Sequence, residues 1–318
     1  MHGMRVVDSG PLSTIQDDGR FGFQHLGFSP TGAVDMRSLY LANHLVGNRP
    51  GTPAIEVTLG GLKLCPTDDI TFAVVGVGGN VVVGGRPRPC NQTLYAQANE
   101  EIRIVRLKGA RAYLAVAGGV AVKKVLGSAA TDLVAGIGGF EGRRLQPGDM
   151  VEIGMFESRR VSRAVRESFL PQMQAVRIVE MSSGPQRSLF TDDALFRLTT
   201  SEYTVSAHSD RVGLRLLGPS VSPRQGNILS EGQPAGAVQI PPSGEPIVLL
   251  AGRLTIGGYP KVGVVSRRDL ADLAQLLPGS RIRFRWRPLE AVVEETRNWL
   301  LCLRDSDCCT RVVVEDSD

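Results

Sequence analysis

Short runs of valine, isoleucine and leucine recur between residues 54 and 154. Glycine, proline or aspartate separates one run from the next, as expected where β-strands alternate with turns. The predicted strands cover residues 54–59, 62–65, 70–75, 80–83, 102–107, 111–116 and 150–153. Strands at this spacing, with no helices between them, predict a barrel or a sandwich.

A second block of short apolar runs follows the first. Its predicted strands cover residues 176–181, 203–206, 214–217, 237–240, 247–251, 263–265 and 281–286. The final strand of each block comes directly after a Pro-Gly turn, at Pro147-Gly148 and at Pro278-Gly279. This weak internal repeat favours two domains of similar architecture over one large sheet.

A few helices interrupt the strands. Asp35 is a plausible N-cap for a helix whose apolar residues recur at helical spacing until Gly47. Short helices are predicted over 192–198 and 268–276, and an amphipathic helix begins near Leu289. The polar end of the chain after that helix is expected to dock on the body of the protein or on a partner.

The segment between the two blocks is rich in glutamate, arginine and serine and has no apolar period. It contains Arg159, Arg160, Arg163 and Arg166, which are typical of a solvated face rather than a ligand site. We therefore divide the chain into an N-terminal barrel (1–155), a linker (156–175), a C-terminal barrel (176–287) and a helical, polar tail (288–318).

Composition agrees with two β-rich domains. The 318 residues include 37 glycines and 19 prolines, whereas only 5% are aromatic. The net charge is +4 with no lysine or arginine stripe, so a nucleic-acid partner is not expected. The most apolar stretch, 113–122, is shorter than the roughly 20 residues of a membrane helix, and no secretory signal is present, so we expect a cytoplasmic protein.

The cysteines and histidines give no sign of a metal site. The five cysteines are Cys65, Cys90, Cys302, Cys308 and Cys309. They form no C-x-x-C pair, so we expect reduced thiols. Cys308-Cys309 has no nearby histidine or second cysteine pair that could complete a metal site. The chain also lacks a P-loop, a G-x-S-x-G elbow, an H-E-x-x-H motif and a dinucleotide-binding G-x-G-x-x-G.

Candidate chemistry is confined to polar residues inside glycine-rich, otherwise apolar strings, where loops of a rigid scaffold present side chains. For Glu56 in an apolar strand, a buried structural role and a functional role remain equally open. Each string taken singly is more often structural than functional. The strings are 24–27, 31–35, Asn43 with 54–61, 209–213, 228–232 and 255–261.

Taken together, several longer strings resemble one family. They are Ser-Thr-Ile-Gln-Asp-Asp-Gly-Arg (13–20), Gln-His-Leu-Gly (24–27), Leu-Ala-Asn-His-Leu-Val-Gly-Asn (41–48), Arg-Ala-Tyr-Leu-Ala-Val-Ala-Gly-Gly (111–119), Ser-Asp-Arg (209–211), Ile-Leu-Ser-Glu-Gly (228–232) and Gly-Gly-Tyr-Pro-Lys (257–261). In this order they resemble the biotin-dependent carboxyltransferase family. The family is also called KipA-like or allophanate hydrolase subunit 2, and it includes the C subunit of 5-oxoprolinase.

The resemblance implies a mainly β fold of two tandem cyclophilin-like β-barrels with a few short helices. It implies a subunit of an ATP-dependent 5-oxoprolinase, which converts 5-oxoproline, ATP and water to L-glutamate, ADP and phosphate. The expected partners are a KipI-like protein, similar to the B subunit of 5-oxoprolinase, and a third protein similar to its A subunit. Two alternatives remain open: a KipA-type regulator that binds a kinase inhibitor, and the carboxyltransferase half of a urea carboxylase-like biotin enzyme.

The matched positions supply candidate site residues. Lys261, Asp210, Arg211 and Glu231 are the expected catalytic residues, with Lys261 stabilising an oxyanion or phosphate. For Arg211 two roles are open: it is held by Asp210, or it binds a carboxylate. A surface or barrel-mouth ion pair is the structural alternative for Lys261 and for Arg211. The expected substrate-binding residues are Gln24, His25, Asp35, Asn43 and Tyr259.

ATP is implied as a co-substrate of the complex, whereas a use of biotin stays open because the chain has no biotin-accepting Met-Lys-Met motif. Two positions depart from the family pattern Ala-Asp-Arg-Gln-Thr, since Gly252 and Leu254 replace an acid and an amide. Another departure is the string 76–80, which lacks an acid found in the family. Lost polar groups of this kind imply a changed substrate choice or weaker catalysis.

Overall fold

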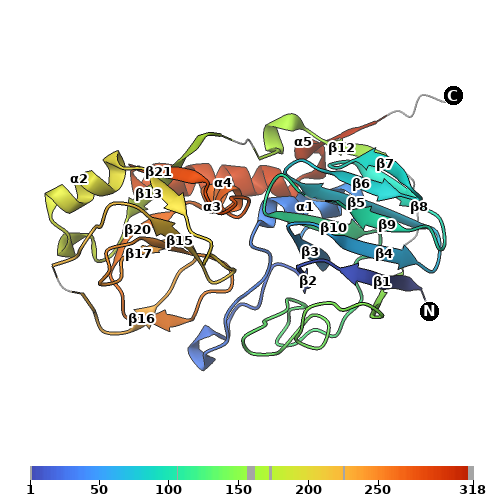
Figure 1. The fold of residues 1–318 in the computed structure, drawn as a ribbon, viewed down its shortest axis with the longest axis horizontal. Helices are drawn as coiled ribbons and strands as arrows, with labels where there is room; N and C mark the ends of the chain where they lie inside the picture. Colours follow the sequence, from blue (N-terminus) through green and yellow to red (C-terminus); the bar gives the residue numbers. More distant parts are fainter. Residues whose placement is uncertain (1, 106, 156–161, 172–173, 225, 314–318) are drawn as a thin grey trace. The chain divides into compact units, whose positions relative to one another are not determined.

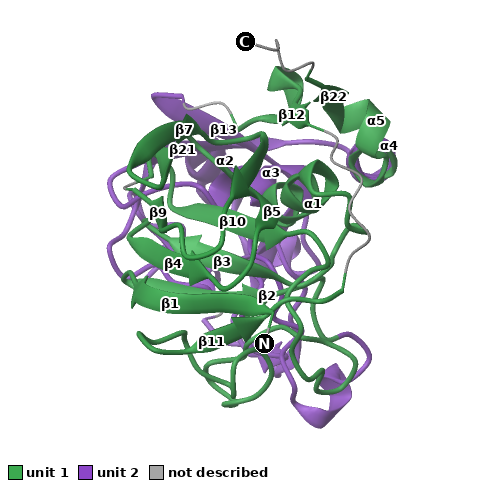
Figure 2. Ribbon diagram, turned by 90° about the vertical axis from the view of Figure 1, so that its right-hand side faces the viewer, with its two compact units in different colours: residues 1–20, 35–171, 301–318 green, residues 21–34, 172–300 purple. Residues whose placement is uncertain are grey.

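A computed structural model describes residues 2–105, 107–155, 162–171, 174–224 and 226–313 of the chain, which is mainly β (Figure 1). The contacts divide it into two compact units, coloured separately in Figure 2. Unit 1 comprises residues 1–20, 35–171 and 301–318, and unit 2 comprises residues 21–34 and 172–300. The mainly β fold expected from the sequence is confirmed. The contact division differs from the expected boundaries because residues 21–34 group with unit 2 and the end of the chain groups with unit 1.

Two large antiparallel sheets form the core of unit 1. The six-stranded sheet has the order β11 (Met150–Glu152), β1 (Gly3–Ser9), β4 (Leu62–Pro66), β9 (Ile102–Ile104), β6 (Asn80–Val83) and β7 (Arg86–Pro89). The five-stranded sheet has the order β2 (Leu12–Gln16), β3 (Ala54–Thr58), β10 (Arg111–Val116), β5 (Ile70–Gly76) and β8 (Thr93–Ala96). Alternate apolar residues of both sheets enter one core, as Ile70, Phe72 and Val74 of β5 illustrate.

Helix α1 (Met36–Leu45) begins where the sequence predicts. The Asp35 carboxylate accepts hydrogen bonds from Ser38 N at 3.0 Å and from Ser38 Oγ at 2.6 Å, so Asp35 caps the helix. The helix ends before Gly47, whose φ of 75° is readily adopted only by glycine.

The string 13–20 holds a long loop of unit 1 in place. Ser128 Oγ and Ala129 N both donate to the Asp17 carboxylate, each at 2.6 Å. The buried Arg20 guanidinium donates to Val125 O at 3.1 Å and to Ala130 O at 2.9 Å. One of the strings that carry the family resemblance therefore has a structural role.

Unit 2 is built on a closed barrel of seven strands. Around the barrel these are β13 (Val176–Ser183), β20 (Lys261–Val265), β17 (Ala237–Gln239), β18 (Ile247–Leu249), β15 (Gly213–Leu217), β14 (Tyr203–Val205) and β21 (Arg281–Trp286). Two helices, α2 (Asp192–Thr200) and α3 (Arg267–Leu273), accompany it. Strands β16 (Glu231–Gly232) and β19 (Ile256–Gly257) form a separate two-stranded sheet. Strand β13 pairs in parallel with β21, which closes the barrel.

The two Pro-Gly turns lie where the weak internal repeat predicts them. Gly148 precedes β11 and Gly279 precedes β21, with φ of 95° and 87°. Only glycine adopts this backbone region at little cost. The same turn chemistry therefore leads into the last strand of the six-stranded sheet in unit 1 and into the last strand of the barrel in unit 2.

The end of the chain forms α4 (Leu289–Arg304), α5 (Ser306–Cys309) and β22 (Thr310–Val312). Strand β22 pairs with β12 (Arg163–Val165), and a 3₁₀ turn, η2 (Glu167–Phe169), follows β12. The expected linker thus contains a strand, paired with the tail that was expected to dock on the body. Residues 156–161 and 172–173 of that linker, including Arg159 and Arg160, lie outside the described residues.

The expectation of five reduced cysteines is wrong. Cys302 and Cys308 form a disulfide with a Cα–Cα distance of 5.7 Å, whereas Cys65, Cys90 and Cys309 are free. The chain turns between α4 and α5, and this turn brings the two cysteines together. They are six residues apart in the sequence, so a search for C-x-x-C pairs does not find them. Among the described residues, no helix is long and apolar enough to cross a membrane.

Candidate functional site

Lys261 and Glu231 form an ion pair in unit 2. Lys261 is the first residue of barrel strand β20, and its side chain is only 2% exposed. Its ammonium donates to Glu231 Oε1, and the Glu231 side chain is 42% exposed. The buried cation is therefore paired with a carboxylate that reaches the solvent. Of the site residues expected from the sequence, these two are brought into direct contact.

The Glu231 carboxylate is held in its ionised form. The hydrogen bond from Lys261 is the largest of the effects that lower its pKa, and a further hydrogen bond comes from Gln186 Nε2 at 2.7 Å. Hydrogen bonds to the charged form of a carboxylate stabilise that form. Glu231 is therefore suited to bind a cationic or hydrogen-donating group rather than to act as an acid near neutral pH.

Amide side chains surround this ion pair. Gln186 also accepts from Lys261 N at 3.1 Å, and Gln239 lies directly opposite Lys261 in the barrel. Gln239 Nε2 donates to Gln233 Oε1 at 2.9 Å, and Gln233 Nε2 donates to Gly257 O at 2.9 Å. Such a network fixes donors and acceptors in one arrangement.

Sequence reasoning missed the three glutamines of this network. Gln239 is an amide within the apolar run 237–240, which is the kind of interruption that drew attention to Glu56. Gln233 comes two residues after Glu231, and Gln186 follows Gly184-Pro185 at a strand end. A search for amides inside apolar strands would have found Gln239.

Close backbone approach is a feature of this site, as expected from the two glycines 257 and 258. A Cβ atom at Gly257 would lie 2.7 Å from Gln233 Nε2, and one at Gly258 would lie 3.0 Å from Ile228 O. Gly184 is tighter still, because its Cβ would lie 2.3 Å from Lys261 O. A side chain at Gly184 would move the backbone that carries Lys261.

Exposed apolar residues occur along the same stretch of unit 2. Leu229 is 92% exposed, and Leu254, Ile256 and Tyr259 are also exposed. Tyr259, expected to bind substrate, stands between β19 and β20, two residues before Lys261. Of the two departures from the family string, Leu254 lies on the surface at 62% exposure.

Arg211 and Asp210 occupy a loop before β15. Asp210 is exposed, and its Oδ1 accepts from Val212 N at 2.8 Å and Gly213 N at 3.0 Å, which makes it a turn-forming residue. Arg211 Nη2 donates to Gly32 O at 2.6 Å. Burial lowers the pKa of Arg211 to about 10, so the guanidinium stays charged near neutral pH. A Cβ at Gly252, the other departure, would lie 3.0 Å from Arg211 O.

Gln24 and His25 lie in a 3₁₀ turn, η1 (Gln24–Leu26), which groups with unit 2. Gln24 Oε1 accepts from Gly22 N at 2.9 Å, and His25 is exposed. The sequence had assigned both residues to the first barrel. Their assignment to substrate binding stays a prediction, now attached to the unit that contains Lys261.

Asp35 belongs to a buried polar chain in unit 1. Asp35 N donates to Tyr113 Oη at 2.9 Å, and Tyr113 Oη donates to Glu56 Oε2 at 2.6 Å. Arg111 Nε lies 3.8 Å from Glu56 Oε1. All four residues are buried, and these contacts lie within unit 1. These contacts give Asp35 and Glu56 a role in stabilising the fold.

Asn43 is likewise bonded inside unit 1. Its Nδ2 donates to Leu39 O at 3.2 Å and to Thr52 O at 2.9 Å, and its Oδ1 accepts from Asn48 Nδ2 at 2.9 Å. Since the side chain is fully buried, these contacts explain the residue without a ligand. Substrate binding by Asp35 and Asn43 therefore stays a prediction with a sufficient structural alternative.

Within the part of the chain that the structure describes, no group of three or more histidine, cysteine, aspartate or glutamate side chains is arranged to hold a metal ion. The hydrogen-bond donors of the site are the Lys261 ammonium and side-chain amides. This donor set fits an oxygen of an amide or a carboxylate better than a metal ion.

Comparison with known proteins places the chain in a family. The family model "Carboxyltransferase domain, subdomain A and B" matches residues 26–286. The C subunit of the Escherichia coli 5-oxoprolinase is 37% identical over 286 residues, which are 88% of this chain and 90% of that protein.

Solved structures agree with this match. The crystal structure of TTHA0988 is 36% identical with a TM-score of 0.82 and covers 90% of this chain, which spans only 55% of that protein. The Kluyveromyces lactis urea amidolyase is 25% identical with a TM-score of 0.88, over 99% of this chain and 20% of that protein. The chain belongs to the family described as carboxyltransferase domain, subdomain A and B.

Proposed function

We propose that this protein is a subunit of an ATP-dependent 5-oxoprolinase, which opens 5-oxoproline to L-glutamate with hydrolysis of ATP to ADP and phosphate. The observation that carries the proposal is the Lys261–Glu231 pair with its amide surround, in a chain 37% identical to the C subunit of a 5-oxoprolinase. The substrate is a cyclic amide, and its ring opening develops negative charge on the amide oxygen. A buried ammonium and fixed amide donors are suited to stabilise that charge.

In the proposed mechanism, the substrate oxygen replaces Glu231 as the partner of Lys261. Glu231 is the exposed member of the pair and can move toward solvent, whereas Lys261 is fixed in the barrel. Gln186 Nε2, which donates to the same Glu231 oxygen, supplies a second donor for the incoming oxygen. The released Glu231 carboxylate then accepts from the ring N–H of the substrate.

A second protein would complete this site. The side chains of Leu229, Leu254 and Ile256 are each more than half exposed, in the stretch that also carries Glu231. A surface with several exposed apolar side chains favours a protein interface. We propose that a protein similar to KipI, or to the B subunit of 5-oxoprolinase, covers it and excludes water from Glu231. ATP enters as a co-substrate of the complex, which includes a third protein similar to the A subunit of 5-oxoprolinase.

The proposal is tested by reconstitution. The chain is co-purified with a candidate small partner, the third protein is added, and 5-oxoproline-dependent ATP hydrolysis is measured. Turnover that needs all three proteins supports the proposal. Tight partner binding with no turnover overturns it and favours the KipA-type regulator.

Carboxyl transfer is the second candidate function. The favouring observation is the TM-score of 0.88 with the Kluyveromyces lactis urea amidolyase over 99% of this chain. The two functions are separated by offering the complex 5-oxoproline with ATP in one assay and urea with a carboxylated biotin carrier in another. Carboxylation of urea without lactam hydrolysis would favour carboxyl transfer. Catalytic roles for Asp210 and Arg211 and a cytoplasmic location remain predictions under either function.

A further inference from the structure

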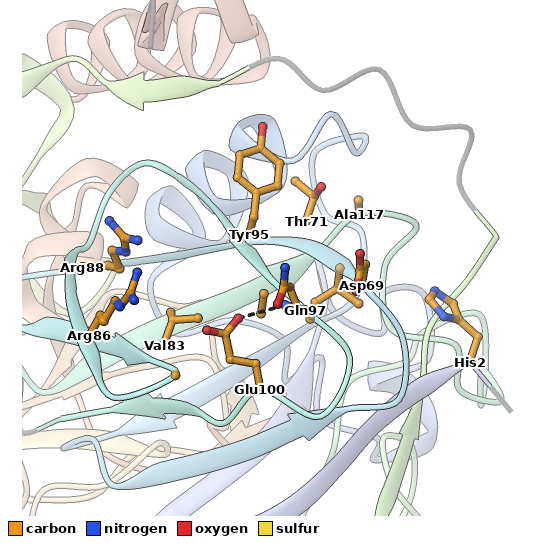
Figure 3. Close-up of a pocket in the computed structure, with 13 residues that line it drawn as sticks. His2, Asp69, Thr71, Val83, Arg86, Arg88, Tyr95, Gln97, Glu100 and Ala117 are labelled. Carbon is orange, nitrogen blue, oxygen red and sulfur yellow. Dashed lines mark hydrogen bonds between the residues drawn. The ribbon is translucent and has the colours of Figure 1, made fainter. Parts of the chain in front are cut away.

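Unit 1 contains a pocket that shares no residue with the Lys261–Glu231 site. Its volume is about 680 Å³, and it is drawn in Figure 3. Residues of strands β7 and β8 line it. Strand β7 lies at the edge of the six-stranded sheet, and β8 lies at the edge of the five-stranded sheet. Pockets of about 300–1,000 Å³ are typical of sites for small molecules and cofactors.

Two arginines of β7 line this pocket from one face of the strand. Arg86 pairs with Val83, and Arg88 pairs with Val81. Residues directly opposite in an antiparallel pair share a face of the sheet, and both valines belong to the core of unit 1. By this register the two cations share the face of the sheet from which Val81 and Val83 enter the core, at a sheet edge where all four residues of β7 are exposed. Figure 3 shows their side chains next to each other.

These two cations are available to a ligand. Neither Arg86 nor Arg88 forms an ion pair with any residue that the structure describes, and both are exposed. Their Cα atoms lie roughly 7 Å apart, given a rise of about 3.4 Å per residue of strand. Two guanidinium groups at this spacing can bind one phosphoryl group from two sides, or two linked phosphoryl groups.

Hydrogen-bond acceptors line another part of the pocket. Asp69 Oδ1 accepts from Ala98 N and Glu100 Oε2 accepts from Gln97 N, each at 2.9 Å. The backbone thus fixes both carboxylates while each keeps a second oxygen that can accept from a ligand hydroxyl. Tyr95 of β8 also lines the pocket and can pack against a ring.

We propose that this pocket binds a phosphorylated small molecule of about nucleotide size. Arg86 and Arg88 bind its phosphate groups, and Asp69 and Glu100 accept hydrogen bonds from its hydroxyl groups. A carboxylate ligand such as an amino acid would share the arginine chemistry but would fill much less of the pocket. This inference goes beyond the proposed function and does not depend on it.

An alternative role for the arginines is protection of the sheet edge. Inward-pointing charges and prolines both discourage pairing of an edge strand with another chain, and β7 reads Arg-Pro-Arg-Pro. In that case Arg86 and Arg88 would suppress association of the protein and would bind no anion.

Isothermal titration calorimetry on the full chain distinguishes these roles. The probes are pyrophosphate and ADP, with L-glutamate as the carboxylate probe. The variants are Arg86→Ala/Arg88→Ala and, for the case that this pair aggregates, Arg86→Lys/Arg88→Lys, which keeps the charge but removes the bidentate forks. The matched control is Arg103→Ala, which removes the same charge from an exposed position on β9 of the same sheet.

We expect pyrophosphate and ADP to bind the natural chain, with ADP tighter because of its hydroxyl groups. The double alanine variant should weaken both by at least about tenfold, the double lysine variant should weaken them measurably, and the control should stay within about twofold. Absence of phosphate binding at millimolar concentration would overturn the proposal. Equal binding by the double variants and the control, or glutamate binding tighter than ADP, would also overturn it.

Discussion

The two units use buried polar residues differently. In unit 1, Asp35, Glu56 and Asn43 are buried, and their polar atoms bond to other groups of the same unit. In unit 2, Lys261 is equally buried, but its partner Glu231 is 42% exposed. A polar network that is closed within the protein stabilises the fold, whereas one that ends at the surface can exchange a partner for a ligand. Solvent access of one member therefore separates the structural network from the candidate site.

The largest expected effect on stability comes from opening the closed network. Glu56→Ala removes the carboxylate that Tyr113 Oη donates to and that lies beside Arg111. Loss of a buried charge partner typically costs about 3–5 kcal/mol of unfolding free energy. Urea unfolding of the variant measures this loss. A loss below about 1 kcal/mol would show that the network is not structural.

A smaller loss is expected for Asn43→Ala. The substitution leaves the carbonyls of Leu39 and Thr52, of which the first is buried, without this donor, at a cost of about 1–3 kcal/mol. Asn80→Ala, at an exposed strand position, is the matched control and should change the unfolding free energy by less than about 0.5 kcal/mol. If the activity of folded Asn43→Ala in the complex fell more than about tenfold, Asn43 would belong to the site after all.

The pH dependence of unit 1 depends on His44. Burial is the largest cause that lowers the pKa of His44, while its hydrogen bond to Leu303 O at 2.9 Å opposes that shift. The unfolded state then binds more protons below a pH of about 6.5, so stability is lost as the pH falls below that value. The slope cannot exceed about 1.4 kcal/mol per pH unit for one proton.

The same urea titration at several pH values measures this slope. His44→Gln should remove part of the decline between about pH 7 and pH 5. His25→Gln, at an exposed position, is the matched control and should leave the decline unchanged. Identical pH profiles for the natural chain and His44→Gln would contradict the assignment.

The smallest effect is expected for Leu254→Gln, which restores the amide of the family pattern. Because Leu254 is 62% exposed, the unfolding free energy of the chain should change by less than about 0.5 kcal/mol. Thermal unfolding of the isolated chain measures it. A loss above about 1 kcal/mol would place Leu254 in the packing of unit 2 rather than on an open surface.

Strands with strong apolar patterns could be predicted from the sequence almost to the residue, and Asn80–Val83 and Arg111–Val116 are examples. Strand β7 was missed because its Arg-Pro-Arg-Pro sequence has no apolar pattern, and only its pairing with β6 makes it a strand. The Cys302–Cys308 disulfide was missed because it depends on the turn between α4 and α5.

Only part of the candidate site could be predicted from the sequence. Lys261 and Glu231 were both selected, but their contact depends on strands far apart in the chain. Asp35 and Asn43 were selected by the same reasoning although their contacts are structural. Sequence patterns identify polar residues in apolar surroundings but do not tell whether the resulting network is closed.

In the proposed function, Lys261 acts on the substrate and is not needed to stabilise the fold. Lys261→Met keeps most of the length of the side chain and removes its charge, and the Glu231 side chain keeps its contact with solvent because it is 42% exposed. The decisive measurement is 5-oxoproline-dependent ATP hydrolysis by the reconstituted complex, with Asn80→Ala, at an exposed strand position, as the control. We predict a 10²–10³-fold lower rate, roughly as for loss of an oxyanion donor, in a folded variant that still binds its partner. A rate within about twofold of that of the natural chain would contradict this role of Lys261, because loss of an oxyanion donor costs at least about 10²-fold in rate.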